Sequence, residues 1–369
     1  MRAHDAGRGR GYWYRGGIVR TVVDAAQHRS AARRSGMRDV ARAAGVSVST
    51  VANVLNNPAV VAEGTRRRVE EAMASVGFVR SGPARQLRGM PSRLVGSVTL
   101  DQANPFYAEL NRGIEDRLDE AGCLVLACST DVQADKELRI LRLLEEQSPR
   151  GIIVTPTGEN LAEVGAISSR GTPVVLLDAP RGALDLCAVA VDHVAGGRLA
   201  GEHLIELGHR RIAFLSASWE GGPVRERRDG LCRALAEAGL EPPVEVHIAR
   251  EGFFGGTDAA VSDLLHCTDQ PSAVVCMNDI AAVAVVRALR ERGLRVPDDM
   301  SVVGYDDLPF AAHVQPPLTT VRQPIREMGR VAADLLLSEG SEGRAGHRHR
   351  ELVFTPQLMA RSTTAPPRP

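Results

Sequence analysis

Residues 37–56 constrain the fold of this chain more tightly than any other stretch, because their pattern predicts two short helices joined by a glycine. The first predicted helix carries Val40, Ala41 and Ala44 on one face, and Gly45 supplies the turn that follows. Apolar positions in the second helix recur at i, i+3 and i+4, so the two helices can share a small apolar core.

The second predicted helix follows Ser47, whose hydroxyl is a favoured helix cap. Its apolar residues Val51, Val54 and Leu55 point back at the first helix. The outward face is mostly small or polar, with Val48, Ser49, Ala52, Asn53 and Asn56. Such a helix end fits into a DNA major groove. The segment therefore predicts a helix-turn-helix DNA-binding unit, with an ordinary helical hairpin as the alternative.

The charge of the chain is divided in a way that suits DNA contact at one end only. Residues 1–88 hold 16 arginines and 6 acidic residues, a net charge of +10. The remaining residues hold 29 basic and 39 acidic residues, a net charge of −10. A basic segment attracts phosphates, whereas an acidic one repels them.

From residue 94 onward, short apolar runs alternate with amphipathic helical segments. The runs cover residues 94–100, 123–128, 151–154, 174–177, 188–191, 212–215, 244–248, 273–277 and 301–304. Alternation of this kind predicts parallel, doubly wound sheets. The runs are too many for one sheet, and a second copy of the pattern begins near residues 192–194. We therefore expect an all-α helix-turn-helix head followed by an α/β ligand domain of two lobes, which resembles periplasmic sugar-binding proteins.

The stretch from Asp39 to Asn56 reads D-V-A-x-x-A-G-V-S-x-x-T-V-x-x-V-L-N. Further phrases follow it in order: Thr65-Arg66-x-x-Val69, Asn104-Pro105-Phe106-Tyr107, Gly151-Ile152-Ile153, Asp192 with Gly197 and His203-Leu204, Gly208-His209-Arg210, Asn278-Asp279, Val303-Gly304-Tyr305-Asp306-Asp307, and Pro317-Leu318-Thr319-Thr320-Val321. From residue 37 to 361 the chain thus resembles the LacI/GalR family of bacterial transcription regulators. The resemblance implies a homodimeric repressor of pseudo-palindromic operator DNA, controlled by a small molecule bound between the lobes.

Composition and resemblance together suggest a division of the chain. Residues 1–36 are expected to be a disordered extension, or else not to be translated because the start site has been assigned too early. We expect a helix-turn-helix domain at 37–77, a hinge or a plain linker at 78–92, and an effector-binding and dimerisation domain at 93–361. Lobe 1 is expected at about 93–192 and 323–338, lobe 2 at about 193–322 and 351–361, and a disordered tail at 362–369. The resemblance implies crossings between the lobes near residues 320–324 and again near 339–350.

The resemblance also implies which residues touch DNA. The expected set is Ser47, Val48, Ser49, Thr50, Asn53, Asn56, Thr65, Arg85, Leu87 and Arg88. Among them Asn53 departs from the arginine common in relatives, and Leu87 matches the residue that wedges into the minor groove. A third helix is expected over residues 65–76, where Ala62 replaces the usual serine cap.

Matched in the same way, the effector site should be lined by Phe106, Tyr107, Asp178, Arg227, Phe254 or its neighbour Phe253, Asp279 and Gln323. Most of these follow predicted strands, where open sheets bind ligands. Aromatic faces, a carboxylate and a guanidinium together favour a neutral sugar or glycoside, with a purine-type ligand as the alternative. Phe106 has an alternative interpretation as a core residue and Arg227 as the partner of a surface acid. Asp279 is expected to be an unpaired carboxylate in the cleft.

Other functions find little support in the sequence. It contains no nucleophile elbow, no phosphate-binding glycine loop and no metal-ligand spacing, so no catalytic residue, cofactor or metal is expected. The paired acids 298–299 and 306–307 are interpreted as turn residues. An enzyme or a free sugar-binding protein on the same fold remains a remote alternative.

Two further features bear on surroundings and on metals. No apolar run is long enough for a membrane helix and no secretory signal is evident, so we expect a cytoplasmic protein without a membrane partner. The six cysteines form no C-x-x-C pair and are interpreted as buried reduced thiols. His347 and His349 lie in a span with the composition of a surface loop and are interpreted as solvated.

Overall fold

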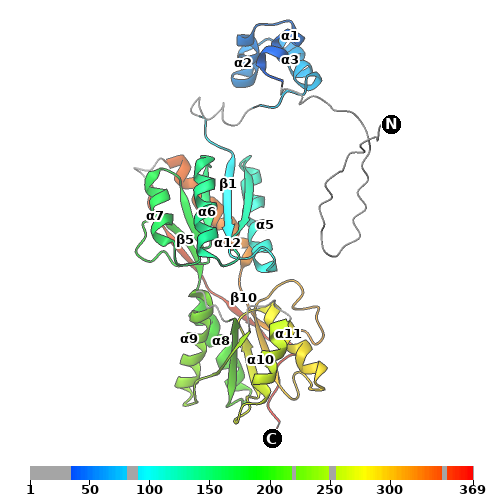
Figure 1. Cartoon of the computed structure of the whole chain (residues 1–369), viewed down its shortest axis with the longest axis vertical. Helices are drawn as coiled ribbons and strands as arrows, with labels where there is room; N and C mark the ends of the chain where they lie inside the picture. The colour runs from blue at the N-terminus through cyan, green and yellow to red at the C-terminus, as the bar shows by residue number, and fades with distance from the viewer. Residues whose placement is uncertain (1–34, 81–89, 218–221, 249–254, 343–346, 369) are drawn as a thin grey trace, which may run out of the picture. The chain divides into compact units, whose positions relative to one another are not determined.

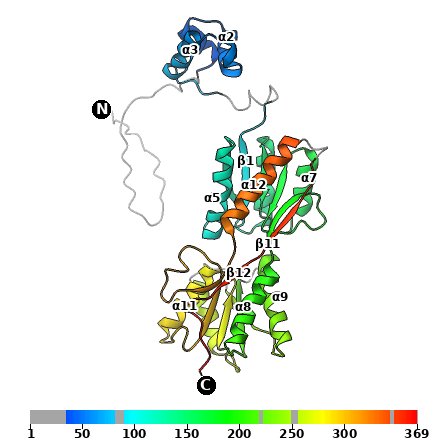
Figure 2. The same cartoon turned by 180° about the vertical axis from the view of Figure 1, so that it is seen from behind.

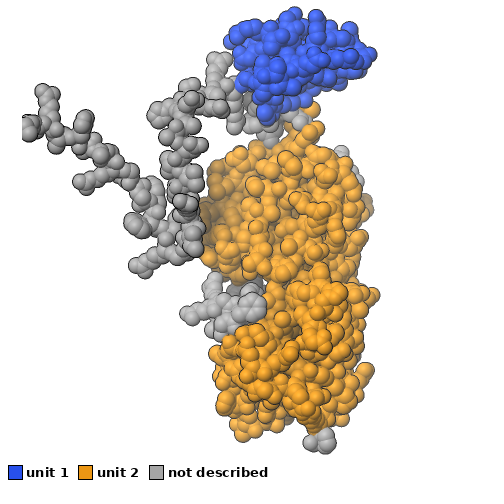
Figure 3. Space-filling model, turned by 90° about the vertical axis from the view of Figure 1, so that its right-hand side faces the viewer, with its two compact units in different colours: residues 1–82 blue, residues 83–369 orange. Residues whose placement is uncertain are grey.

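The computed structural model describes residues 35–80, 90–217, 222–248, 255–342 and 347–368. The chain falls into two compact units, Met1–Gly82 and Pro83–Pro369 (Figure 3). Among the described helices, none has both the length and the apolar character needed to cross a membrane.

The first unit is a small three-helix head. Its elements are α1 (Met37–Ala44), α2 (Val48–Asn56), the 3-10 turn η1 (Pro58–Val60) and α3 (Glu63–Ser75). Gly45 joins α1 to α2 with a φ of 66°, a left-handed conformation that glycine adopts without a Cβ clash. The core contains Val40, Ala41, Val51, Val54, Val69 and Ala72. The predicted helix-turn-helix fold is confirmed.

The third helix begins earlier than its apolar pattern predicts. The expected range is 65–76, and the structure starts α3 at Glu63. Ala62 is the N-cap and provides no side-chain hydrogen bond, a loss that costs about 0.5–2 kcal/mol. Glu63 in the first turn offsets part of this cost, because a negative charge is favourable at the positive end of the helix dipole.

Lobe 1 of the second unit, which contains β1 and β5 in Figure 1, is built on a six-stranded sheet in the order β11-β5-β4-β3-β1-β2. Its strands are β1 (Leu94–Thr99), β2 (Leu124–Ser129), β3 (Gly151–Val154), β4 (Val174–Leu177), β5 (Cys187–Val191) and β11 (Glu351–Phe354), all paired in parallel. Its helices are α5 (Pro105–Glu120), α6 (Ala134–Glu146), α7 (Leu161–Arg170) and α12 (Ile325–Glu342). Ile153 of β3 packs with α5 and α12, whereas Ile152 packs with α6 and α7, so the sheet is covered on both faces (Figure 2).

Lobe 2 repeats this plan with the strand order β12-β10-β9-β8-β6-β7. Its strands are β6 (Ile212–Ala217), β7 (Val244–Ile248), β8 (Ala273–Cys276), β9 (Ser301–Asp306), β10 (Thr319–Arg322) and β12 (Gln357–Met359), with β12 antiparallel to β10. Its helices are α8 (His193–Glu206), α9 (Gly222–Glu237), α10 (Gly255–Leu265) and α11 (Asp279–Glu291). Phe214 of β6 packs with α8 and α9, and Leu215 packs with α10 and α11. Two doubly wound lobes were predicted, and both are confirmed.

The last crossing between the lobes lies elsewhere than predicted. Residues 351–361 were expected in lobe 2 after a crossing near 339–350. Instead β11 pairs in parallel with β5 of lobe 1, and this last crossing to lobe 2 comes later, between Phe354 and Gln357 (Figure 2). The expectation is therefore wrong for residues 351–354. A polar loop in the sequence marks a break in secondary structure, but it does not say which sheet the next strand joins.

The C-terminal tail is also different from its prediction. Residues 362–369 were expected to be a disordered tail. Thr363 is fully buried, accepts a hydrogen bond from the backbone of Thr319 at 2.8 Å and donates one to the carbonyl of Val302 at 2.7 Å. Arg368 pairs with Asp299 at 2.6 Å. The described part of the tail, through residue 368, is thus packed on lobe 2.

Candidate functional site

The N-terminal half of α2 presents small side chains on the surface of the head. Ser47 Oγ accepts a hydrogen bond from the backbone N of Thr50 at 3.1 Å, so the predicted cap is confirmed. Val48, Ser49 and Asn53 are exposed. An exposed valine, hydroxyl and amide on one helix offer one apolar and two hydrogen-bonding contacts for base edges.

The far end of α2 is tied to the segment that follows α3. Arg80 donates to the carbonyl of Leu55 at 3.0 Å and to Asn56 Oδ1 at 2.5 Å, a contact that no sequence pattern suggested. Thr65 lies half-buried in the first turn of α3. The remaining predicted DNA contacts, Arg85, Leu87 and Arg88, lie outside the described residues.

A second candidate site lies where strand ends of the two lobes approach each other. Its residues are buried and polar, and they are called here the buried polar cluster: Asp178, His193, Arg227, Tyr305, Asp306 and Gln323. Asp178 follows β4 of lobe 1, Gln323 lies in the crossing between β10 of lobe 2 and α12 of lobe 1, and the other four belong to lobe 2. Open parallel sheets bind ligands at this edge.

His193 connects the two lobes. Its Nε2 lies 3.1 Å from Asp178 Oδ1, and its Nδ1 lies 3.2 Å from the hydroxyl of Tyr305. Arg227 Nε also donates to Nδ1, at 3.3 Å. Because arginine can only donate, Nδ1 is an acceptor and Nε2 carries the proton that is donated to Asp178. Burial, followed by the positive charge of Arg227, lowers the pKa of His193, so the imidazole is neutral at pH 7.

Arg227 is the cation of the cluster. It donates to the carbonyl of Met277 at 2.6 Å, and its guanidinium carbon lies 3.8 Å from the ring centroid of Tyr305. Its Nη1 lies 4.0 Å from Asp306 Oδ1. Burial raises the pKa of Asp306 well above its ordinary value, although Arg227 and a 2.7 Å hydrogen bond from Gln323 oppose the shift. The charges of this cluster are therefore stabilised by a few directed contacts with protein groups rather than by solvent.

Close helix packing holds these groups in place, and two of them have a strained backbone. A Cβ on Gly197 of α8 would lie 1.8 Å from the carbonyl oxygen of Arg227, so only glycine lets α9 approach α8 this closely. Asp178 and Asp306 have φ values of 55° and 118°, which are rare for residues with a side chain. Strain of this kind costs about 1–3 kcal/mol per residue and concentrates at functional sites.

The structure separates the predicted effector residues into groups. Asp178, Arg227 and Gln323 belong to the buried polar cluster. Tyr107 lies close enough to this cluster for the charge of Asp178, after burial, to raise the pKa of its hydroxyl. Phe106 is 4% exposed and packs in the core of lobe 1, as its alternative interpretation held. Phe254 lies outside the described residues.

Asp279 is not the unpaired carboxylate that was predicted. It is fully buried and accepts hydrogen bonds from the backbone N of Leu308 at 2.8 Å and from Thr320 Oγ1 at 2.5 Å. Burial nevertheless raises its pKa to about 7. The carboxylate joins the start of α11 to β10 and to the segment after β9. The prediction that it is unpaired is wrong, because the protein itself supplies two donors.

Sequence reasoning missed three members of the cluster, His193, Tyr305 and Asp306. Asp306 was interpreted as a turn residue, although it ends a strand of a parallel sheet next to the strand that precedes Gln323. This position at the end of a parallel strand could have marked Asp306 as a candidate ligand-binding residue. His193 gave no signal, because its role depends on two side chains far away in the sequence.

The chain matches the model of "Bacterial regulatory proteins, lacI family" over residues 36–81 and that of "Periplasmic binding protein-like domain" over residues 202–364. It is 34% identical to the HTH-type transcriptional regulator DegA of Bacillus subtilis over 333 residues, which cover 89% of this chain and 97% of DegA. The chain belongs to the lacI family. This lacI-family chain is also similar to the lac repressor dimer bound to operator and the anti-inducer ONPF, with a TM-score of 0.77, 29% identity, and coverage of 90% of this chain and all of that one. A LacI family regulator from Enterococcus faecium with bound ribose gives a TM-score of 0.67 at 29% identity, covering 74% of this chain and 99% of that one.

Membership in the lacI family confirms the resemblance seen in the sequence. The chain is a DNA-binding transcription regulator under effector control, with the head as its DNA-binding part. The relatives named here are regulators and not enzymes.

Proposed function

We propose that this chain is a homodimeric repressor of pseudo-palindromic operator DNA, controlled by a neutral sugar or glycoside bound at the buried polar cluster. The regulator works in the cytoplasm, where its operator is, and has no catalytic activity of its own. The observation that carries the proposal is the group of three buried polar side chains where the two lobes meet: a carboxylate after β4, a guanidinium on α9 and an amide after β10. The lac repressor dimer on its operator and the ribose-bound relative support it.

Sugar hydroxyls suit these groups because each hydroxyl both donates and accepts. Gln323 Oε1 is buried and accepts no hydrogen bond from the described residues, so a ligand hydroxyl would satisfy it. Asp178 and Arg227 can each make charge-assisted bonds to neighbouring hydroxyls. Tyr107 offers an aromatic ring beside these charges. Asp279 already accepts one hydrogen bond on each oxygen from the protein, and a carboxylate has about four acceptor sites, so it can still accept from a ligand hydroxyl.

Control of DNA binding follows from the contact between the lobes. The hydrogen bond from His193 to Asp178 links lobe 2 to lobe 1. A ligand that competes for Asp178 or Arg227 changes the free energy of that link and so shifts the balance between lobe arrangements. The hinge at 78–92, most of which lies outside the described residues, would transmit this shift to the head.

A thermal-shift screen of sugars, glycosides and purines on the full chain tests the proposal. We expect a sugar or glycoside to stabilise the parent protein, and both Gln323→Leu and Arg227→Ala to lose that shift while still binding operator. Arg198→Ala is the matched control, because Arg198 is an exposed arginine on α8 that pairs with Glu202. A purine as the best ligand would favour the alternative effector class, and a sugar that binds both variants as tightly as the parent would refute this site.

A further inference from the structure

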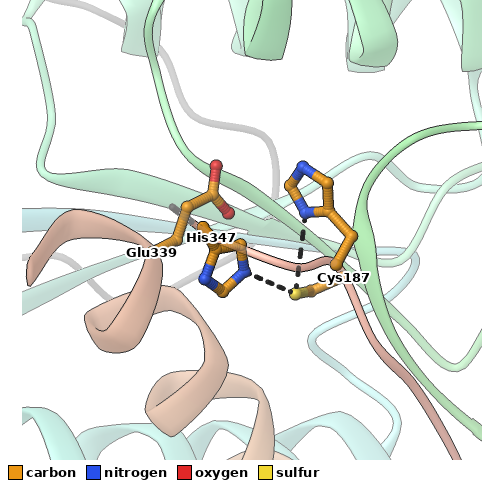
Figure 4. A group of neighbouring side chains, drawn as sticks. Cys187, Glu339 and His347 are labelled. Atoms are coloured by element: carbon orange, nitrogen blue, oxygen red, sulfur yellow. Dashed lines mark hydrogen bonds between the residues drawn. The ribbon is translucent and has the colours of Figure 1, made fainter. Parts of the chain in front are cut away.

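Four side chains with metal-binding atoms converge at one edge of lobe 1, away from the buried polar cluster. They are Cys187, Glu339, His347 and His349, and one ligand atom of each lies within 4.8 Å of the others. Figure 4 shows the side chains of Cys187, Glu339 and His347 directed toward one another.

The distances are close to those of a metal site. His347 Nε2 lies 3.2 Å from Cys187 Sγ, and His349 Nδ1 lies 3.8 Å from the same sulfur. In tetrahedral zinc sites, bonds of about 2.0–2.3 Å place neighbouring ligand atoms roughly 3.3–3.8 Å apart. The two imidazoles therefore already have the right spacing from the thiol, and the widest pair of donors needs only a small inward movement.

Burial and access both suit a bound cation. Cys187 is fully buried and Glu339 is 3% exposed, whereas the two histidines are half-buried. A cavity of about 350 Å³ reaches Glu339, His347 and His349 and gives an ion a route to them. Two anionic ligands, a thiolate and a carboxylate, would balance a divalent cation and remove the cost of a buried charge.

The fold brings these ligands together from three separate places in the chain. Cys187 is the first residue of β5, Glu339 lies near the end of α12, and the histidines precede β11. Because β11 pairs with β5 from Glu351 and Ala188 onward, the histidine segment runs beside Cys187. The spacing His347-x-His349 puts both rings on the same side of an extended chain. These residues were interpreted separately from the sequence, as solvated histidines and a buried thiol.

We propose that Cys187, Glu339, His347 and His349 form a tetrahedral Zn²⁺ site that fastens the end of α12 and the residues just before β11 to β5. Mixed sulfur, nitrogen and oxygen donors suit Zn²⁺, and four protein ligands make a closed, structural site. The thiol proton leaves to solvent as the metal binds. Since β11 leads directly into the crossing to β12, the ion would stabilise the strand from which the chain passes to lobe 2.

The test uses the full chain without a polyhistidine tag, loaded with ZnCl₂ and titrated against a chromogenic chelator. We expect one tightly bound Zn²⁺ per chain and a higher melting temperature in its presence. Replacement by Co²⁺ should give thiolate-to-cobalt charge-transfer absorption and the strong visible bands of tetrahedral cobalt. Absence of bound Zn²⁺, or a cobalt spectrum without the thiolate band, would overturn the proposal.

Variants assign the ion to these residues. His347→Ala and Cys187→Ala should each lower Zn²⁺ affinity by at least about 100-fold, because loss of residues that only support ligands already costs about 10- to 100-fold. His347 is half-buried, so its variant should fold even if Cys187→Ala does not. The matched controls are His313→Ala, at an exposed histidine, and Cys123→Ala, at another buried thiol of lobe 1. Equal Zn²⁺ affinity in parent and His347→Ala would place the ion elsewhere and refute the site.

Discussion

Asp279→Asn should stabilise the protein at alkaline pH, because it removes a carboxylate whose ionisation opposes folding. Burial raises the pKa of Asp279 from 3.8 to about 7 in the folded state. The folded state therefore holds the proton more tightly than the unfolded chain does. Stability from this group is fully present below about pH 3.8 and is lost as the pH rises to about 7.

The magnitude follows from the shift and from what asparagine keeps. At 1.36 kcal/mol per pKa unit, a shift from 3.8 to about 7 corresponds to roughly 4 kcal/mol at pH 8. Asparagine has the same shape, and its carbonyl can still accept from the backbone of Leu308 while its amide donates to Thr320 Oγ1. Asp279 begins α11, so loss of its charge from the helix N-terminus takes back up to about 1 kcal/mol. The net gain expected at pH 8 is about 3 kcal/mol.

Melting temperatures of the variant and the parent, measured by circular dichroism from pH 4 to pH 8, test this reasoning. The difference should be near zero at pH 4 and should grow with pH, at roughly 2–4 °C per kcal/mol for a lobe of this size. Asp263→Asn, at an exposed position of α10, is the control and should show no such trend. A variant that is less stable than the parent at pH 8, or a difference that does not change with pH, would refute the account.

Two further predictions concern DNA binding. Asn53→Arg should move the preferred base from adenine toward guanine at the contacted position of the half-site, since asparagine pairs best with adenine and arginine with guanine; an unchanged consensus after selection from randomised operators would contradict this. Leu87→Ala should weaken specific operator binding by a few kcal/mol in an anisotropy titration, the scale of the unstacking that an inserted side chain supports. Equal affinity of this variant and the parent would indicate that residues 78–92 are only a tether.

The head was predictable because its determinants are local. Gly45, Ser47 and the apolar spacing of Val51, Val54 and Leu55 act within a turn or two of helix, so their effects can be read from neighbouring residues. The same holds for the alternating strands and helices of the lobes. The mistakes arose where pairing over long distances decides the outcome, as when β11 joined β5 rather than lobe 2.

For the effector site, some predictions from the sequence agree with the structure and one does not. Asp178, Arg227 and Gln323 were predicted from a resemblance that spans the whole domain, and they meet in the buried polar cluster. The prediction that Asp279 is unpaired was wrong because its donors, Leu308 and Thr320, come from other segments. A carboxylate has the same chemistry whether its partner is a ligand or the protein, so its local sequence could not distinguish the two cases.

The sequence by itself determined the element types, the two-lobed plan and the DNA-binding head, because hydrophobic periodicity and capping depend on near neighbours. Only the tertiary structure decided which polar groups face one another across the chain. Asp178 with His193, Thr363 with Val302, and Cys187 with His347 are each joined by contacts between distant segments. The free energy of such contacts depends on distance and burial, and both are properties of the folded chain.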